Sequence, residues 1–179
     1  MLNYLDLYLI HWPVPKNNKY IQTWKALEAL YSDGKVRAIG VSNFNISHLE
    51  NILTQCKIVP AVNQVEFHPW FLQTELLEYM KQKGIFAEAW GPLGQGALLD
   101  NETLMEIAKK YNKTVAQVII RWDIQKNIIT IPKSSKEDRI ASNANVFDFE
   151  LSDPDIKTIN SLNKNYRIGP DPVEFDLGV

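Results

Sequence analysis

The sequence has very little cysteine and no long apolar run. Of its 179 residues only one is a cysteine, Cys56, which can form no internal disulfide and suits the reducing cytoplasm. A single thiol offers no cysteine-based metal site, and we expect no metal centre. No apolar run approaches the ~18 residues of a membrane span, and Met1–Asp6 lacks the basic-then-apolar pattern of a signal peptide. We therefore predict a cytoplasmic protein with no membrane partner.

The sequence also lacks an excess of charge of either sign. Lys and Arg number 19 against 21 Asp and Glu, a formal net charge of -2. Nucleic acid as the main partner needs a concentrated basic face, so this balance argues against it. The 45% hydrophobic and 22% charged residues are ordinary for a folded protein. The length suits one domain, and because no linker or composition break interrupts the chain, we expect a single domain over residues 1–179.

Five short runs predict strands that alternate with helices. Each run is nearly all apolar, as expected for strands buried on both faces of a parallel sheet. The runs are Leu5–Trp12, Ala38–Val41, Ala61–Phe67, Ile85–Trp90 and Ile128–Ile131. Helical apolar stripes lie between them, within Ile21–Tyr31, Ile46–Leu53, Leu76–Met80, Leu104–Tyr111 and Val115–Trp122. A further helix is expected to open at Ser134-Ser135, with Ser135 and Asp138 as its capping pattern, and a last one at Ser152.

The glycine pattern excludes the commonest nucleotide-binding α/β folds. No G-x-G-x-x-G follows the first strand, and the Gly91–Gly96 cluster has the wrong order and lacks the ending of a Walker loop. Polar residues instead gather where the strands end, as on the catalytic rim of a barrel. They are His11, Ser42-Asn43, Glu66 with His68, Trp90-Gly91 and Lys133-Ser134. We predict an α/β fold, an incomplete (β/α)8 TIM barrel of about five βα units plus a C-terminal helix, because a full barrel has eight strands and about 250 residues.

Some of these polar groups suggest chemistry, although each also has a purely structural explanation. His11 could donate to a developing oxyanion at the rim or form only a local hydrogen bond; His48 and His68 are weaker candidates. Ser42-Asn43 and Asn63-Gln64 could hold a planar amide, or serve as turn and core residues. Trp90 could present a flat face to a ligand that approaches over the glycines that follow it, or belong to the core.

The segment Ile131–Arg139 has the features of a phosphate site. Lys133, Lys136 and Arg139 place positive charge around an expected helix start, and the loop after a late barrel strand is a common place for phosphate. The alternative is a solvated charged turn, since Glu137 and Asp138 offset part of that charge.

Five ordered motifs together resemble the aldo-keto reductase family. They are Leu5–Pro13, Gly40–Phe44, Asn63–Pro69, Gly91–Gly94, and Ile131–Ser134 with Arg139-Ile140, and they span the chain from about Leu2 to Pro172. The resemblance implies a (β/α)8 barrel that reduces aldehydes and ketones with NADPH and without a Rossmann domain. The partner it implies is a small-molecule carbonyl substrate.

The resemblance also implies a role for each matching residue. It makes His11 the histidine of the family's catalytic Asp-Tyr-Lys-His set and places Trp12 in the substrate pocket. Ser42, Asn43 and Gln64 would hold the nicotinamide carboxamide, and Trp90 stands where a tyrosine usually stacks on the nicotinamide. The remaining cofactor contacts would be Leu93 near the pyrophosphate, Lys133, Ser134 and Arg139 on the 2′-phosphate, and Asn143 on the adenine. Ser142 departs from the glutamate often found at its position.

A larger departure concerns the rest of the catalytic set. In the family, strands that carry the catalytic Asp, Tyr and Lys precede the strand of His11, and no such segment precedes it in this sequence. Carbonyl reduction needs a proton donor at the oxygen, so we expect the activity of this truncated chain to be weak or absent.

Two other functions stay open. The chain could be a non-catalytic half-barrel that binds NADP(H) or a partner chain, and we expect self-association through the exposed edges at Leu5–Trp12 and Ile128–Ile131. A barrel hydrolase with His11 as its base explains the phosphate loop but not the amide-holding residues, and the sequence has no nucleophile motif for it.

Overall fold

The computed structural model describes residues 3–176. Met1, Leu2 and residues 177–179, which the expected single domain includes, lie outside the described residues. The chain divides into two compact units. The first unit comprises residues 1–65, 74–87 and 169–179, and the second comprises residues 66–73 and 88–168. The single domain stays a prediction.

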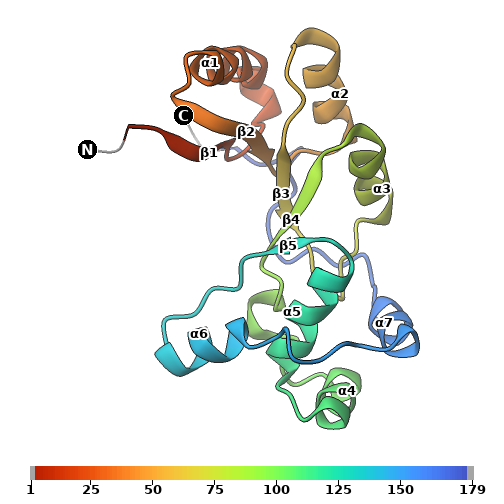
Figure 1. The fold of residues 1–179 in the computed structure, drawn as a ribbon. Helices are drawn as coiled ribbons and strands as arrows, with labels where there is room; N and C mark the ends of the chain where they lie inside the picture. The colour runs from red at the N-terminus through yellow and green to blue at the C-terminus, as the bar shows by residue number, and fades with distance from the viewer. Residues whose placement is uncertain (1–2, 177–179) are drawn as a thin grey trace. The chain divides into compact units, whose positions relative to one another are not determined.

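Strands and helices alternate along the chain, so the predicted α/β class is confirmed (Figure 1). The strand order is β1-β2-β3-β4-β5, and the pairings of β1 with β2, β2 with β3, and β4 with β5 are parallel. The strands are β1 (Leu5–Ile10), β2 (Val36–Ser42), β3 (Val62–Glu66), β4 (Phe86–Trp90) and β5 (Ile129–Thr130). The helices are α1 (Tyr20–Ser32), α2 (Ile46–Gln55), α3 (Thr74–Lys83), α4 (Glu102–Tyr111), α5 (Val115–Gln125), α6 (Glu137–Ala144) and α7 (Asp153–Asn160), with single 3-10 turns at η1 (Pro15–Asn17) and η2 (Gly94–Gly96).

The first unit packs α1, α2 and α3 against β1, β2 and β3. Its core includes Trp24, Val41 and Leu49, each fully buried, and the indole of Trp24 donates to the carbonyl of Ile58 at 3.2 Å. Gly40 permits β2 and β3 to approach closely, since a Cβ there would lie 2.6 Å from the carbonyl oxygen of Val62. The ends of β1, β2 and β3 are thereby held in a fixed register, which positions the polar residues that follow them.

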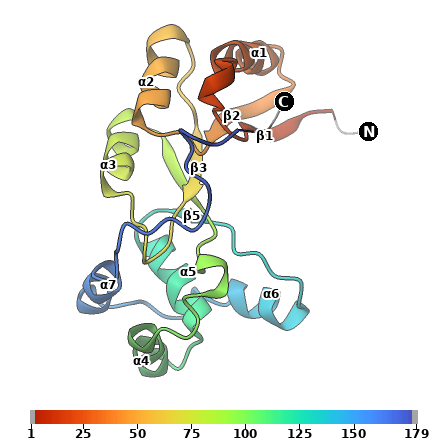
Figure 2. The same cartoon turned by 180° about the vertical axis from the view of Figure 1, so that it is seen from behind.

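The second unit gathers α4 to α7 around the end of β4 and β5 (Figure 2). Phe67 and Trp122 stack in its core, with ring centroids 5.1 Å apart and nearly parallel planes. The indole of Trp122 donates to Asn160 Oδ1 at 3.0 Å, so a buried α5 side chain ties down the end of α7. The last helix begins as predicted, because Ser152 caps α7 and its hydroxyl accepts from the Asp155 amide.

The expectation that every strand is buried on both faces is wrong for β1. Leu5, Leu7 and Tyr8 are 43%, 37% and 44% exposed. The physical reason is position, since β1 stands at the end of the strand order and pairs with β2 alone among the described strands. β2 has neighbours on both sides, and most of its residues are buried.

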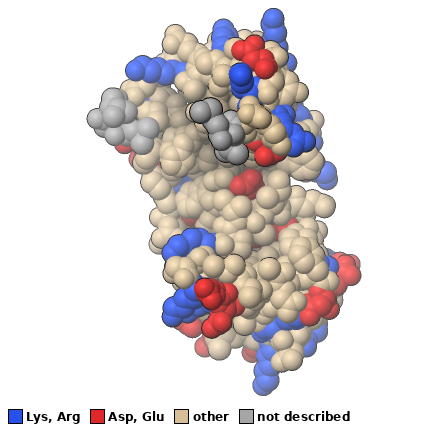
Figure 3. Space-filling view, turned by 60° about the vertical axis from the view of Figure 1, so that its left-hand side comes forward, with Lys and Arg blue, Asp and Glu red and all other residues tan. Residues whose placement is uncertain are grey.

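The surface carries charges of both signs. On the face drawn in Figure 3, Lys and Arg side chains are interspersed with Asp and Glu. Within residues 3–176, the structure contains no helix with the length and apolar character needed to cross a membrane.

Candidate active site

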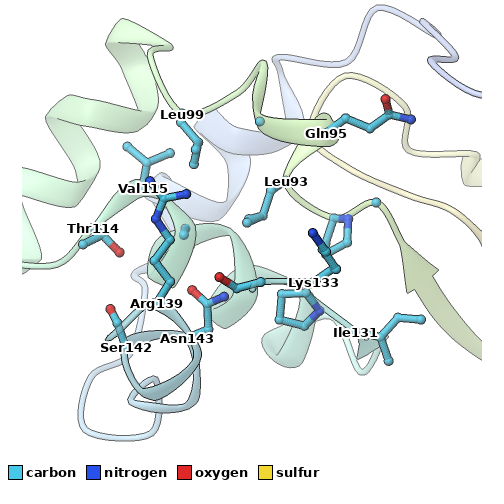
Figure 4. Close-up of a pocket in the computed structure, with 16 residues that line it drawn as sticks. Leu93, Gln95, Leu99, Thr114, Val115, Ile131, Lys133, Arg139, Ser142 and Asn143 are labelled. Carbon is cyan, nitrogen blue, oxygen red and sulfur yellow. The ribbon is translucent and has the colours of Figure 1, made fainter. Parts of the chain in front are cut away.

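A cavity of about 690 Å³ lies within the second unit (Figure 4). Its walls come from the loop after β4, the first turn of α5, the segment after β5, and α6. Five of the residues predicted to contact a cofactor line it: Leu93, Lys133, Ser134, Arg139 and Asn143. Segments more than forty residues apart in the sequence therefore converge on one cavity.

The loop after β4 can form this wall because glycine supplies its backbone. Gly91, Gly94 and Gly96 have φ values of 60°, 57° and 98°, in the region that residues with a Cβ rarely adopt. The chain consequently turns sharply after Trp90 and brings Leu93 to the cavity.

Helix α6 contributes one face of its side chains to the cavity. Arg139, Ser142 and Asn143 are spaced i, i+3 and i+4 and share that face (Figure 4). The predicted helix start at Ser134-Ser135, with Ser135 as the cap, is wrong. α6 begins at Glu137 after an extended Lys136 and has no side-chain cap, because the Ser134 hydroxyl accepts the Lys136 amide at 3.2 Å and forms a turn there instead.

The cavity favours an anion. Lys133 and Arg139 line it, no Asp or Glu does, and neither cation forms an ion pair within residues 3–176. The first turn of α5 also lines the cavity, and its dipole adds positive potential there. Thr114 caps this helix by accepting from the Gln117 amide at 3.2 Å. These groups can together hold a phosphate.

The predicted amide-holding residues lie together in the first unit. The Ser42 hydroxyl donates to the carbonyl of Gln64 at 2.8 Å, and the Asn43 amide group donates to the Ser42 hydroxyl at 3.1 Å. Asn43 adopts a left-handed backbone, φ 64°, directly after β2, which turns its side chain back toward the strand ends. Asn63 is a core residue instead, since it pairs with the backbone of Phe44 at both ends of its amide.

His11 follows the end of β1 with its ring exposed to solvent. Its carbonyl accepts from the Asn43 side chain at 3.0 Å, which links it to the amide-holding group. The imidazole nitrogens have no hydrogen-bond partner in the described part of the chain, so they are available to a ligand. Trp12 is half-buried against Phe175, with ring centroids 4.1 Å apart.

Trp90 ends β4 in the second unit and is half-buried. Its carbonyl accepts from the Phe67 amide at 3.3 Å, so the backbone of the indole-bearing residue is held in the sheet. The glycine that follows carries no side chain beside the indole.

The other two histidines have structural partners. His48 closes the capping box of α2: its Nδ1 accepts from the Asn45 amide at 3.3 Å. Burial lowers the pKa of His48, although the charge of Asp171 opposes that shift. His68 is 1% exposed and lies 2.9 Å from the Glu66 carboxylate.

Sequence reasoning missed two features of this region. Gln95, Leu99, Thr114 and Val115 line the cavity but belong to no motif that singles them out. Glu66 also meets Arg167, whose Nη1 lies 3.8 Å from Oε2. The spacing of Glu66 and His68 at a strand end hinted at a polar cluster, but only the fold brings a residue 101 positions later beside it.

Comparison with known proteins shows which family this chain belongs to. The model of the Aldo/keto reductase family matches residues 1–164. The chain is 61% identical over 174 residues to a glyoxal reductase of Bacillus subtilis, covering 97% of this chain and 62% of that protein. It is 55% identical to a 9,11-endoperoxide prostaglandin H2 reductase of Trypanosoma cruzi, covering 99% of this chain and 63% of that protein.

Solved structures agree with these matches. A mutant of Gox0644 crystallised in complex with NADPH superposes with a TM-score of 0.96 at 45% identity, covering 98% of this chain and 65% of that one. The likeness confirms the predicted barrel-type α/β fold. The chain spans about 62% of the length of the curated relatives named above.

Proposed function

We propose, from the premise that this chain belongs to the aldo/keto reductase family, that its cavity binds NADP(H) and that it serves hydride transfer to an aldehyde or ketone. The single observation that carries the proposal is the convergence of Leu93, Lys133, Ser134, Arg139 and Asn143 on one cavity. These are the residues that the family resemblance assigns to the phosphate and adenine end of the cofactor.

The residues of the cavity fit this end of the cofactor. Lys133 and Arg139 offer charge to a 2′-phosphate without competition from a carboxylate in the lining. The planar fork of Arg139 suits two phosphate oxygens at once, and the hydroxyl of Ser134 can donate to a third. The amide of Asn143 can both donate to and accept from an adenine edge. We infer a preference for NADP(H) over NAD(H).

The family resemblance assigns the reacting end of the cofactor to four further residues. Ser42, Asn43 and Gln64 carry the donors and acceptors that a carboxamide needs, and hydrogen bonds hold the Ser42 and Asn43 side chains beside the Gln64 backbone. Trp90 would offer a flat face to the nicotinamide, which supplies the hydride when bound.

His11 would orient the substrate carbonyl. Its imidazole can donate to the carbonyl oxygen, whose negative charge grows as the hydride arrives, and Trp12 would line the substrate pocket beside it. Only His11 of the family's catalytic set is matched in this sequence, and the proton donor of the family is a tyrosine. We therefore infer that the isolated chain turns over carbonyl compounds slowly or not at all.

The test is a fluorescence titration of the purified 179-residue chain with NADPH, followed by an assay of NADPH oxidation. Saturable binding supports the proposal, whereas a folded chain that binds no NADPH at millimolar concentration contradicts it. Glyoxal is the first substrate to assay, since a relative at 61% identity is named a glyoxal reductase. Turnover at rates normal for an enzyme would contradict the inferred loss of activity.

The exposed large side chains of β1 favour a second candidate function. Its exposed Leu5, Leu7 and Tyr8, on a strand at the end of the strand order, can pair with another chain. In this alternative the chain is a non-catalytic module that binds NADP(H) or a partner chain. A partner chain would pair with the β1 edge. Cofactor binding together with stable association and no turnover would distinguish it from an enzyme.

A further inference from the structure

We propose that Glu66 is a positioning residue for the cofactor cavity. Its buried carboxyl group holds Arg167 and the backbone of Ile168, and Ile168 then supports the Gly91–Gly96 loop that forms one cavity wall. The proposal rests on the proposed function for its effect on NADPH, but the contacts that it names all lie within the second unit.

The Glu66 carboxyl group lies in the interior with several polar contacts. Glu66 ends β3 and is 1% exposed. Its Oε1 accepts the backbone N–H of Ile168 at 2.6 Å, across 102 residues of sequence. Its Oε2 lies 3.8 Å from Nη1 of Arg167. A buried carboxylate is tolerated only where donors compensate for lost water, so these contacts hold residues 167 and 168 strongly.

His68 completes this cluster. Its Nε2 lies 2.9 Å from Glu66 Oε1, and its ring is 1% exposed, so it covers the carboxyl group on that side. Arg167 brings a cation to the other oxygen of Glu66, and its guanidinium also lies 4.5 Å from the centroid of the Phe71 ring.

The segment before Ile168 is held by hydrogen bonds to residues 70–72. The amides of Lys164 and Tyr166 both donate to the carbonyl of Trp70, at 3.0 Å and 3.1 Å. The side chain of Asn163 accepts the Leu72 amide at 3.2 Å. The hydrogen bond between Glu66 and the Ile168 amide is the last of this series along the chain. By fixing the backbone at Ile168, it orients the Ile168 side chain.

Ile168 meets the cavity loop at Gly94. A Cβ built on Gly94 would lie 3.5 Å from Ile168 Cδ1 and 2.9 Å from Leu98 Cδ1. Gly94 is therefore packed against both side chains, and its neighbours Leu93 and Gln95 both line the cavity. A loop that depends on glycines at positive φ has little intrinsic preference for one shape, so packing from Ile168 fixes it.

The test compares Glu66→Met and Ile168→Ala, separately and together, in the full 179-residue chain. Both single changes should weaken NADPH binding about fivefold, the size of an ordinary coupling between residues in contact. The double change should weaken it little further, because both act through the same contact with Gly94. Glu66→Gln keeps an oxygen for the Ile168 amide but loses the charge opposite Arg167, and it should restore part of the affinity.

Hydrogen exchange gives a readout that does not depend on the cofactor. Glu66→Met should speed exchange of the amides of residues 164–168 and of the Gly91–Gly96 loop, whereas Ile168→Ala should speed the loop alone. Asp155→Asn is the matched control. It removes another carboxylate of the second unit that has no contact with the loop, and it should change neither the loop exchange nor the NADPH affinity.

The results distinguish the role of Glu66 from the proposed binding of NADPH. A wild-type chain that binds NADPH while all the variants bind it equally well overturns the role of Glu66. A wild-type chain that binds no NADPH overturns the proposed function, and loop exchange then decides the role of Glu66. Faster loop exchange in both single variants supports that role, and unchanged exchange overturns it. Additive losses in the double variant also overturn it.

Discussion

At the scale of single residues, two cations of one short segment differ in whether they line the cavity. Arg139 lines the cavity and has no carboxylate partner there, whereas Lys136, three residues earlier, is the residue before α6 and does not line it. The sequence predicted positive charge over this whole segment. It could not separate the two cations, because the Ser134 turn that delays the start of α6 decides which side chains reach the cavity.

Arg139→Met should weaken NADPH binding about tenfold or more while NADH binding changes little. The guanidinium would lose charge-assisted hydrogen bonds to a 2′-phosphate, each contributing about 1.5–3 kcal/mol. Fluorescence titrations with the two cofactors measure the difference. Lys136→Met is the matched control, since it removes an equal charge from the same segment outside the cavity. Equal losses of NADPH affinity in the two variants would show that Arg139 acts only through the overall positive potential of the segment.

Asp123 is a second residue whose environment decides its chemistry. Its side chain is fully buried at the end of α5. Burial raises the pKa of Asp123 well above the usual range, although the Thr130 hydroxyl and the Lys126 ammonium favour the charged form. Neither carboxylate oxygen has a hydrogen bond of good geometry in the described part of the chain, so burial dominates.

Asp123→Asn should stabilise the chain at neutral pH. A raised folded-state pKa means that the folded form binds a proton more tightly than the unfolded form, whose pKa is near 3.8. The contribution of Asp123 to the free energy of unfolding is thus fully present below about pH 4. It is lost as the pH rises through the pKa of the folded state. The variant should therefore raise Tm by about 3 °C at pH 8, a shift that corresponds to about 1 kcal/mol, and change it little at pH 4. Thermal melts at both pH values check this, and an equal shift at both would contradict it.

At the scale of elements, order was predictable from the sequence and exact starts were not. Apolar runs marked all five strands, and Ser152 marked the start of α7, because these signals are local. β5 is shorter than the run Ile128–Ile131 that predicted it. The cap at Ser135 failed because Ser134 offered the backbone a competing hydrogen bond. The contact of α7 with Lys110 and Tyr111 of α4 could not be predicted, since it depends on packing.

The start of α7 should weaken in acid. Burial disfavours charge on Asp155, but hydrogen bonds from Lys110, Ser152 and Tyr111 outweigh it and lower the pKa of Asp155 to about 2. A lowered folded pKa gives stability that is present above the unfolded value of 3.8 and is lost as pH falls toward about 2. Asp155→Asn should therefore lower Tm at pH 7 and have a smaller effect at pH 2.5. Melts over this range test it, and a pH-independent effect would exclude the linkage.

At the scale of the whole molecule, the two ends of the strand order both carry exposed apolar side chains. β1 and β5 stand at these ends, and Ile129 and Ile131 are each 44% exposed, much like the apolar residues of β1. The sequence predicted that these strands would be apolar and edge-prone. It could not predict which side chains would be uncovered, because burial depends on the neighbours that each strand finds.

We expect the chain to self-associate through β1, to an extent that rises with protein concentration. Unpaired backbone groups beside exposed Leu5 and Leu7 form a template for another strand, while the Asp6–Arg37 pair, 2.8 Å apart, is too exposed to block it. Light scattering after size exclusion should give a mass above that of one 20.6 kDa chain, rising with protein concentration. Leu7→Lys should shift the mass toward the single chain, because a charged side chain on an edge strand opposes pairing. Met105→Lys on α4 is the control, since Met105 is also exposed but lies away from any strand edge. A monodisperse single chain at all concentrations would contradict the prediction, and an equal response to both variants would place the association elsewhere.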